Sequence, residues 1–386
     1  MAIDNKDKKV LNVPHLRFPE FTGEWKMATF GDIAKGFDYG MNAAAKSFDG
    51  NNKYIRITDI DEVSSQYLYD DVVSPDGELE DRYLVKENDI LLARTGASTG
   101  KSYLYRNSDG KLYFAGFLIR ANIYKHNSYF VFSQLHTLRY KKWISVMSAR
   151  SGQPGINSQE YASFPVYTTS LQEEDKIATF LKLLDERIIT QNKIIEDLKK
   201  LKSAISKKLL CNDKWTTYKI QDIAEIGRGR VISSVEIEKQ RHPLYPVYSS
   251  QTSNDGIMGY LDNYMFDGEY ITWTTDGANA GTVFYRNGKF NCTNVCGTLK
   301  IHLQFDCHFV SLVLQQATQK YVSSNLANPK LMNNTMASIK IRMPDMETQK
   351  RLSKVFQTLD SRLLVHQCTY EMYLREKQYL LNQMFI

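Results

Sequence analysis

The stretch GASTGKS, residues 96 to 102, comes close to the pattern of a phosphate-binding loop. In that loop four residues separate the two glycines, so that successive backbone amides converge on the phosphates of a nucleotide. Only three residues separate Gly96 from Gly100. Because the loop is one residue short, the sequence does not predict a nucleotide site here.

A second cluster has side chains that bind metal ions elsewhere. Three cysteines and two histidines fall within the segment 292–308: Cys292, Cys296, His302, Cys307 and His308. Thiolates and imidazoles are the ligands that zinc prefers. Against a zinc site, the segment alternates like a β-strand, and the first half of the chain has no cysteine at the matching positions. Buried thiols explain these cysteines better, and we predict no metal site.

Both clusters lie inside a repeat, because the chain carries the same series of landmarks twice. WKMATFGDIAKG from Trp25 is echoed by WTTYKIQDIAEIGRG from Trp215, and SARSGQPGINSQEYASFPV is echoed by SSNLANPKLMNNTMASIKI. A third pair, ILLARTGASTGKSYLYRN and ITWTTDGANAGTVFYRN, aligns Lys101 with Thr282. The second copy therefore lacks the lysine of a phosphate site. The glycines are shared, and we expect them to permit a tight turn after a strand in each copy.

Each copy has two parts. The first part is rich in β-branched and aromatic residues punctuated by Gly, Asn and Asp, which is typical of strands, and it includes short helical stretches. The second part predicts a long helix. In the first copy Ser170 and Glu173 match a capping box, in which the serine covers the N3 amide and the glutamate reaches back. In the second copy Asp345, after Pro344, takes the N-cap position.

Residues in both helices recur at alternating steps of three and four, the seam spacing of a coiled coil. The seam residues are Ile177, Leu181, Leu184, Ile188, Gln191, Ile195, Leu198, Lys202, Ile205 and Leu209 in the first helix, and Leu352, Phe356, Leu359, Leu363, His366, Tyr370, Tyr373, Lys377, Leu380 and Met384 in the second. Polar residues interrupt both seams at matching positions, which costs stability but fixes register. Each helix spans roughly 60 Å at 1.5 Å per residue, too long to be covered by its own globule. We therefore expect the helices to pack on each other, and the short connection between the copies favours antiparallel packing.

The sequence thus predicts an α+β fold: two homologous mixed α/β domains separated by two long helices in an antiparallel coiled coil, with internal pseudo-two-fold symmetry. The expected boundaries are an N-terminal segment at 1–20, a first mixed domain at 21–168, a first helix at 169–211, a second mixed domain at 212–343 and a second helix at 344–386.

Two globules on a helical spacer suit a long, regular ligand such as duplex DNA. Their loops carry side chains that read base edges, since arginine and lysine pair with guanine, and asparagine and glutamine with adenine. The candidates are Arg94, Ser98, Lys101, Arg150, Gln153 and Asn157 in the first copy and Arg228, Arg230, Asn279, Asn328, Lys330 and Asn333 in the second. Taken singly, each also fits the plainer interpretation of a solvated loop residue. The copies keep a framework but differ in these loops, which favours an asymmetric target of two parts.

Several stretches resemble the DNA-specificity subunit (HsdS) of type I restriction–modification systems. They are DILLARTGASTGK, FLIRANIY and GQPGINSQEYASFPVYTTSLQEEDKIATFLKLLDERI, and HLRFPEFTGEWKMATFGDIA is similar to the usual beginning of that family's first recognition domain. LD-x-R segments recur at Asp185 and Arg187 and at Asp360 and Arg362. The resemblance covers essentially the whole chain, although the second copy departs more. It implies that each globule is a target recognition domain, which reads one half of a bipartite DNA site with an unspecified spacer.

The resemblance also implies partners. The helices, the family's central and distal conserved regions, set the spacing and dock two methyltransferase subunits, and two translocating nuclease subunits then join. S-adenosylmethionine, ATP and Mg are expected on those partners, with no cofactor on this chain. The sequence agrees, because it has no Asn/Asp-Pro-Pro-Tyr/Phe run, no complete phosphate-binding loop and no Ser/His/Asp arrangement that spacing supports. A non-catalytic specificity subunit is the expected class.

Composition fits this interpretation. A net charge of +6 and a pI near 8.8 lean towards a polyanionic partner. No apolar stretch approaches the ~20 residues that span a bilayer, and the N-terminus lacks the apolar core of a secretory signal. We therefore expect no membrane association. The five cysteines are odd in number and absent from the first 210 residues, which favours a reducing cytoplasm over a disulfide framework.

Two other classes stay open from the residues alone. An architectural coiled-coil adaptor would bind DNA without base preference, so that excess non-target DNA would displace it at matched salt. An enzyme acting alone would turn over ATP or a methyl donor, and substituting Lys101 would abolish that turnover.

Overall fold

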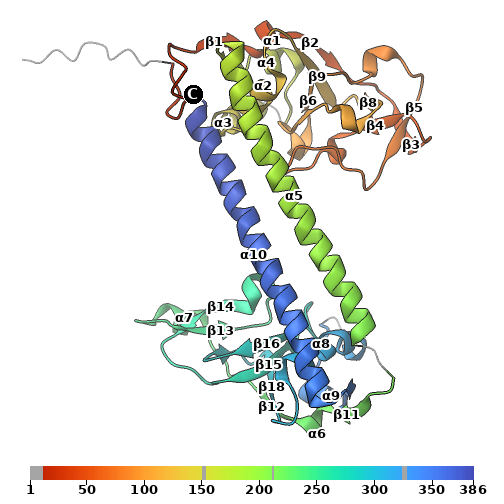
Figure 1. Cartoon of the computed structure of the whole chain (residues 1–386), viewed down its shortest axis with the longest axis vertical. Helices are drawn as coiled ribbons and strands as arrows, with labels where there is room; N and C mark the ends of the chain where they lie inside the picture. Colours follow the sequence, from red (N-terminus) through yellow and green to blue (C-terminus); the bar gives the residue numbers. More distant parts are fainter. Residues whose placement is uncertain (1–11, 150–153, 211–212, 324–327) are drawn as a thin grey trace, which may run out of the picture. The chain divides into compact units, whose positions relative to one another are not determined.

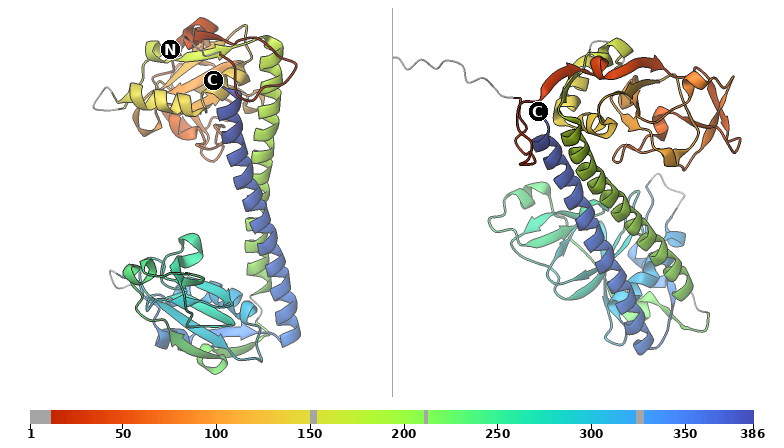
Figure 2. Two further views of the ribbon diagram at one scale, coloured as in Figure 1. Left: turned by 90° about the vertical axis from the view of Figure 1, so that its left-hand side faces the viewer. Right: turned by 45° about the horizontal axis from the view of Figure 1, so that its top comes forward.

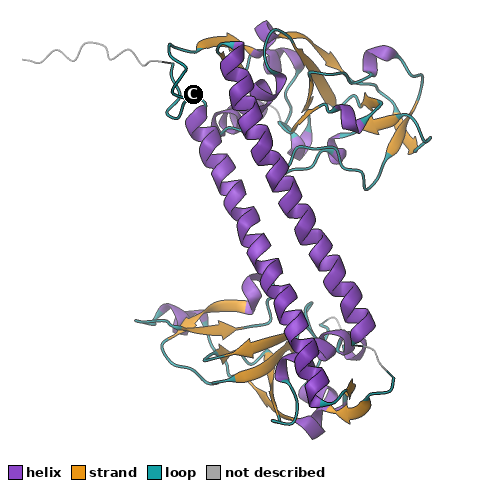
Figure 3. Cartoon of the chain, in the orientation of Figure 1, coloured by secondary structure: helices purple, strands orange, loops and turns teal. Residues whose placement is uncertain are grey.

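The computed structural model describes residues 12–149, 154–210, 213–323 and 328–386. These residues form two compact units. The first unit runs to Lys193 and also includes Gln367–Ile386, and the second unit is Ile194–His366. Both units contain a mixed α/β globule and a part of each long helix, α5 (Leu171–Leu209) and α10 (Met346–Met384). Figure 1 traces the chain through these elements, and Figure 3 shows the strands gathered in the globules.

A four-stranded antiparallel sheet lies at the centre of the first unit, with strand order β2-β9-β6-β7. Its strands are β2 (Ala34–Tyr39), β9 (Leu118–Ile123), β6 (Asp89–Ala93) and β7 (Ser102–Leu104). Strand β6 is buried along its whole length, because Leu92 enters one apolar cluster and Leu91 enters another. Its sequence, DILLA, is accordingly a nearly continuous apolar run instead of an alternating one.

The second unit repeats this sheet, with strand order β12-β18-β15-β16. Its strands are β12 (Ala224–Arg228), β18 (Cys296–Ile301), β15 (Glu269–Thr274) and β16 (Val283–Asn287). The residues that pair with both neighbouring strands are Ile90–Leu92 in β6 and Ile271–Trp273 in β15, so that Ile90 and Ile271 hold the same position. The repeat in the sequence is thus a repeat of sheet topology, and the predicted pair of homologous mixed α/β domains is confirmed.

Smaller strands and helices complete the units. Short antiparallel ladders join β1 (Lys26–Thr29) to β10 (Pro165–Thr168) and β11 (Thr216–Lys219) to β19 (Lys340–Met343), again at matching places in the two copies. The other strands are β3 (Ala44–Ser47), β4 (Lys53–Ile55), β5 (Val73–Asp76), β8 (Leu112–Phe114), β13 (Tyr245–Tyr248), β14 (Ile257–Leu261) and β17 (Asn291–Cys292). The shorter helices are α1 (Phe30–Ile33), α2 (Ser128–Gln134), α3 (Leu138–Ser148), α4 (Ser158–Ala162), α6 (Ile220–Ile223), α7 (Ser234–Glu238), α8 (Cys307–Ala317) and α9 (Asn333–Ser338).

The shared glycines form the predicted turns after β6 and β15. All four have positive φ: Gly96 +70° and Gly100 +93° in the first copy, and Gly277 +92° and Gly281 +83° in the second. Residues with a Cβ rarely adopt this left-handed conformation. At Gly100 a Cβ would also lie 2.9 Å from Ile144. The turn therefore requires glycine for its backbone conformation, and the expectation of a tight turn is confirmed.

The capping box predicted at the start of α5 is only half present. The hydroxyl of Ser170 accepts a hydrogen bond from the amide of Glu173 at 3.3 Å, as expected of a cap. The carboxylate of Glu173, however, does not reach back to the backbone. It accepts two hydrogen bonds from Arg17, at 2.7 and 2.8 Å, and one from the indole of Trp25 at 3.2 Å. Burial of a carboxylate requires such partners, so Glu173 joins the N-terminal segment to the helix instead of closing the cap.

The cap predicted for α10 is present. The carboxylate of Asp345 accepts a hydrogen bond from the amide of Thr348 at 2.9 Å, which satisfies one of the free amides of the first turn.

The two long helices run antiparallel within each unit. In the first unit the start of α5 packs against the end of α10, where Ile177 and Leu380 share one apolar core. In the second unit the end of α5 packs against the start of α10, where Leu209 and Leu352 share another. The paired helix ends lie side by side in both views of Figure 2. Every residue predicted for the two seams is buried or half-buried.

The lysines that interrupt the seams pair with the aspartates of the LD-x-R segments. In the first unit the ammonium of Lys377 lies 2.6 Å from the carboxylate of Asp185. In the second unit Lys202 makes the same ion pair with Asp360. The two pairs occupy matching positions in the aligned copies. These polar seam residues therefore fix the register of the helices through specific partners, as the sequence predicted.

Replacing Asp185 with asparagine is expected to lower the unfolding free energy of the first unit by about 2 kcal/mol. The charge of Lys377, whose side chain is only 17% exposed, would lose its partner, and the 2.5 Å hydrogen bond from the hydroxyl of Tyr129 would pass to a neutral amide oxygen, which is a weaker acceptor than a carboxylate. Asp360→Asn is the matched control, because that pair is more exposed and should cost under about 1 kcal/mol. Urea unfolding of both variants measures the difference, and equal costs would contradict the expectation.

Candidate nucleic-acid interface

In the first unit the loop after β6 is held against the segment before α4. The amide of Gly96 donates to the carbonyl of Pro154 at 3.0 Å, and the amide of Ile156 donates to the carbonyl of Arg94 at 2.9 Å. These bonds bring Arg94, Ser98 and Asn157, which are far apart in the sequence, to one edge of the unit. The sequence predicted all three as candidates for reading bases.

Arg94 is oriented by an aromatic ring. Its guanidinium carbon lies 4.8 Å from the ring centroid of Tyr39, the last residue of β2. The hydroxyl oxygen of Tyr39 accepts a hydrogen bond from the amide of Ser158 at 3.2 Å. Hydrogen bonding by Ser158 lowers the pKa of Tyr39, and the charge of Arg94 adds to this effect. A ring fixed in this way holds the arginine extended, with its donors free of carboxylate partners among the described residues.

Two aromatic residues at this edge, Tyr39 and Phe117, were not predicted from the sequence, because the predicted candidates are all hydrogen-bonding side chains. Phe117 follows β8, and its carbonyl accepts a hydrogen bond from the amide of Arg94 at 3.1 Å. Its side chain is 61% exposed. A large exposed aromatic beside an arginine is the pattern that would have pointed to it. We call Tyr39, Arg94, Ser98, Phe117 and Asn157 the first rim.

The second unit builds the same edge after β15. The amide of Gly277 donates to the carbonyl of Pro329 at 3.0 Å, and the amide of Leu331 donates to the carbonyl of Thr275 at 2.9 Å. Asp276 forms a backbone bridge with Lys330, and their side chains lie 3.5 Å apart. The predicted candidates Asn279 and Asn328 are exposed in the same region.

Arg228, the last residue of β12, completes this edge. Its guanidinium donates to the hydroxyl of Thr275 at 2.9 Å and lies 3.5 Å from the carboxylate of Asp276. The amide nitrogen of Asn333 donates to the carbonyl of Gly227 at 3.3 Å, while its side-chain oxygen is buried without a partner among the described residues. We call Arg228, Thr275, Asp276, Lys330 and Asn333 the second rim.

The two rims carry their arginines at different positions of the same framework. Tyr39 and Arg228 both end the first strand of their sheet, and Arg94 and Thr275 both follow the central strand directly. In the first rim the strand carries the tyrosine and the loop carries the arginine. In the second rim the strand carries the arginine, and the loop carries a buried threonine whose hydroxyl accepts a hydrogen bond from that arginine. The backbone is repeated, but the chemistry presented at its edge is not.

Two of the predicted candidates make ion pairs within the protein. The ammonium of Lys101 lies 2.8 Å from the carboxylate of Glu62. Arg230 makes a two-pronged ion pair with Glu236, one arm of which measures 2.9 Å. Neither cation belongs to a rim, and both stay predicted candidates whose charges are paired within the protein.

Other candidates are constrained or not described. The side-chain oxygen of Asn157 accepts a hydrogen bond from the amide of Glu160 at 2.9 Å and caps α4. Its amide nitrogen and the second lone pair of that oxygen are left to face a ligand. Arg150 and Gln153 lie outside the described residues.

Cys292, Cys296 and Cys307 are buried thiols, as predicted. Burial raises the pKa of Cys296 to about 11 and that of Cys307 to about 12, and it raises the pKa of Cys292 as well. His308, another of the five residues in the suspected cluster, bonds instead to Ser353 at 2.8 Å. Among residues 12–149, 154–210, 213–323 and 328–386, no group of three or more His, Cys, Asp or Glu side chains is arranged to hold a metal ion.

Among the cysteines that the structure describes, Cys368 is therefore expected to be the first that thiol labelling modifies in the native protein, because its side chain is exposed. Cys292, Cys296 and Cys307 should react only after unfolding, since burial hides them and keeps them protonated near neutral pH. Mass spectrometry of the peptides after brief iodoacetamide treatment measures the order. Labelling of Cys296 as fast as Cys368 would contradict the structure, and Cys368→Ser identifies the fast site.

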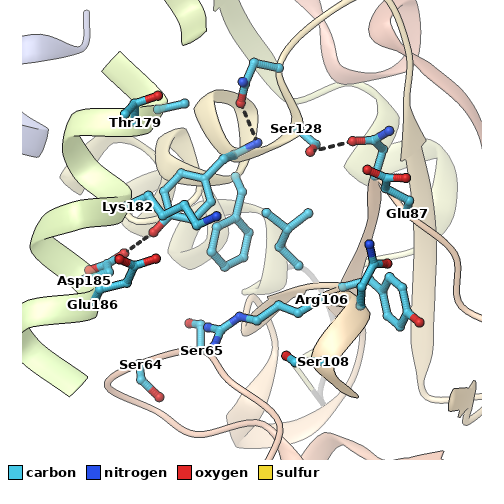
Figure 4. Close-up of a pocket in the computed structure, with 18 of the residues that line it drawn as sticks. Ser64, Ser65, Glu87, Arg106, Ser108, Ser128, Thr179, Lys182, Asp185 and Glu186 are labelled. Carbon is cyan, nitrogen blue, oxygen red and sulfur yellow. Dashed lines mark hydrogen bonds between the residues drawn. The ribbon is translucent and has the colours of Figure 1, made fainter. Parts of the chain in front are cut away.

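A hollow of about 670 Å³ lies in the first unit beside α5. Arg106 extends across it towards Ser65, and Lys182 and Glu186 line the wall formed by α5 (Figure 4). Asp185, at the same wall, is already held by Tyr129 and Lys377. Charges of both signs line the hollow, and they do not assemble a nucleophile with an adjacent base. We assign it no catalytic role.

No helix within the described part of the chain is long and apolar enough to cross a membrane.

Comparison with known proteins defines the class. Residues 22–200 and 212–369 each match the model of the type I restriction modification DNA specificity domain. The chain belongs to this family, and the resemblance noted in its sequence is confirmed. The family consists of non-catalytic specificity subunits, which agrees with the predicted class.

Individual relatives agree with this assignment. The chain is 36% identical over 230 residues to a putative type I specificity subunit of Mycoplasma pneumoniae, covering 58% of this chain and 96% of the relative. It is 39% identical over 178 residues to the specificity subunit of the type I restriction enzyme MpnII of the same organism, covering 45% and 53%. Its fold is similar to the crystal structure of an S subunit of a type I restriction–modification system from M. genitalium, with a TM-score of 0.71, 16% identity, and coverage of 97% and 99%.

Proposed function

We propose that this chain reads DNA for a type I restriction–modification complex, with each unit contacting one half of an asymmetric, bipartite site. The observation that carries the proposal is the pair of rims. One backbone framework is used twice, but Arg94 follows the central strand of its sheet whereas Arg228 ends the first strand, and the two arginines have different neighbours. Identical half-sites would need identical rims. Different rims on one framework fit two different half-sites.

The rims have the chemistry that direct readout requires. Arginine donates two hydrogen bonds to the O6 and N7 atoms of guanine, and asparagine pairs in the same way with adenine. Arg94 is positioned by the ring of Tyr39 and makes no ion pair with the residues that the structure describes, so its donors stay available. Arg228 shares Asp276 with Lys330, and the weak 3.5 Å contacts leave both cations able to exchange that carboxylate for DNA.

The remaining predicted roles belong to the same proposal. Segments 21–168 and 212–343 serve as target recognition domains, and 169–211 and 344–386 set the spacing of the half-sites. The helices dock two methyltransferase subunits, to which two translocating nuclease subunits are added. Exposed apolar side chains on the helices support docking, among them Leu183, Leu364, Met372 and Tyr379. S-adenosylmethionine, ATP and Mg act on the partners, and the complex works on DNA in the cytoplasm.

Competition binding tests the proposal. The full chain, assembled with its methyltransferase partners, is bound to a labelled target duplex at fixed salt and challenged with excess unlabelled DNA. A reader is expected to resist non-target competitor about 1,000-fold better than target competitor. Equal displacement by both competitors would favour an architectural adaptor that binds DNA without base preference.

A further inference from the structure

The backbone around Phe117 is fixed while its ring is exposed. The carbonyl of Phe117 accepts a hydrogen bond from Arg94, and the amides of Gly116 and Leu118 on either side each donate to a backbone carbonyl at 2.8 Å. The side chain is nevertheless 61% exposed. An aromatic ring of this size gains stability when it is covered, so a rigidly presented and uncovered ring suits contact with a ligand.

The turn that carries Phe117 lies beside the arginine of the first rim. Ala93 pairs with Leu118 in the β6–β9 ladder, and the next residue, Arg94, donates its amide to the carbonyl of Phe117 at 3.1 Å. Tyr39, whose ring lies against the guanidinium of Arg94, pairs with Ile119, two residues after Phe117. The backbones of Phe117 and Arg94 are therefore adjacent, and a ligand that covers this edge can meet both the guanidinium and the exposed ring.

The fold does not need an aromatic residue at this position. In the second unit the matching residue is Val295, whose carbonyl accepts a hydrogen bond from the amide of Thr275 at 2.9 Å just as that of Phe117 accepts from Arg94. Val295 is smaller and half-buried. The same turn thus forms with either side chain, and the phenyl ring is particular to the first rim.

We infer that Phe117 is a specificity residue whose ring contacts the 5-methyl group of a thymine, beside the base that Arg94 hydrogen-bonds. A phenyl ring has no hydrogen-bonding group, so it reads sequence only through apolar contact. In the major groove the thymine methyl is the one apolar group that a base edge offers. The inference rests on the proposed function and adds the class of base that this part of the first rim selects.

The test exchanges single thymines for uracils, which removes only the methyl group. The full chain with its methyltransferase partners is bound to duplexes in which each thymine of the half-site read by the first unit is replaced in turn by deoxyuridine. For the unaltered protein, replacement at one position is expected to weaken binding about fourfold. This is the effect of one methyl-sized group that is kept from water. For Phe117→Ala that position should lose its sensitivity, while discrimination at the guanine read by Arg94 persists.

Controls separate the possible outcomes. Phe117→Leu keeps an apolar contact and should retain part of the sensitivity, and Val295→Ala in the second unit should leave it unchanged. Because Phe117 is exposed, a thermal melt of Phe117→Ala should match that of the parent. Sensitivity that survives in Phe117→Ala, or a half-site without thymine, would overturn the inference. Target binding no stronger than non-target binding by the unaltered protein would instead overturn the proposed function itself.

Discussion

Replacing Arg94 with alanine is expected to weaken binding to the target duplex by about 5- to 150-fold while leaving non-target binding nearly unchanged. A two-pronged contact between arginine and guanine contributes about 1–3 kcal/mol of discrimination. Arg94 has no carboxylate partner among the described residues, so its removal leaves no intramolecular charge unpaired. The loss should therefore appear in binding and not in stability. Titration of target and non-target duplexes at one salt concentration measures both effects.

Arg228→Ala is the matched control. It should relax selection in the other half-site and leave the first half-site intact, because the two arginines occupy different units. Tyr39→Phe keeps the ring beneath Arg94 and should preserve most of the discrimination. If Arg94→Ala instead weakened every duplex equally and reduced the salt dependence, Arg94 would be a phosphate contact, and the assignment of the first rim to base reading would be wrong.

Glu173→Ala is expected to destabilise the first unit by about 3 kcal/mol, the largest effect on stability that we predict. The carboxylate of Glu173 is 1% exposed and binds Arg17, Trp25 and the hydroxyl of Thr169. Removing it leaves a guanidinium and an indole N–H without their acceptor. Denaturant unfolding followed by tryptophan fluorescence measures the loss. Thr348→Ala, at the matching position of α10, removes only an exposed hydroxyl contact and should cost under about 1 kcal/mol.

The same carboxylate predicts a dependence on pH. Burial alone would raise the pKa of Glu173, but hydrogen bonds from Arg17, Thr169 and Trp25 outweigh burial and lower it. A group with a lowered pKa in the folded state stabilises the protein above its unfolded pKa, about 4.3 for glutamate. That stabilisation is lost as the pH falls below this value. The difference in stability between the parent and Glu173→Ala should therefore shrink on acidification, and a constant difference down to pH 3 would contradict the assignment.

Features set by local or periodic rules followed from the sequence. The glycine turns, the antiparallel helix ends and the repeated sheet were predictable, because positive φ requires glycine and seam spacing is read residue by residue. The first rim was predictable in part. Arg94 stood out as a hydrogen-bond donor after a strand, but Tyr39 and Phe117 did not, since neither is a typical reader of base edges.

Features that depend on contacts between residues far apart in the sequence could not be predicted from it. Glu173 matched a capping box, but its true partner, Arg17, lies 156 residues away in the sequence. The tripeptide YRN, which both copies contain, also suggests an alignment of the copies that is wrong by one residue. They align Arg106 with Arg286, whereas the ladders place Leu104 and Tyr285 at the same rung, so that Arg106 corresponds to Asn287. Strand register depends on pairing across the sheet, and similarity between letters does not determine it.

The central claim is that two different rims read two different half-sites, and mapping methylated adenines across the genome of the host, with and without this gene, tests it most directly. The account predicts the loss of a single motif, made of two short and unequal half-sites around an unspecified gap. Loss of a motif with two identical half-sites, or no loss of any motif, would contradict it.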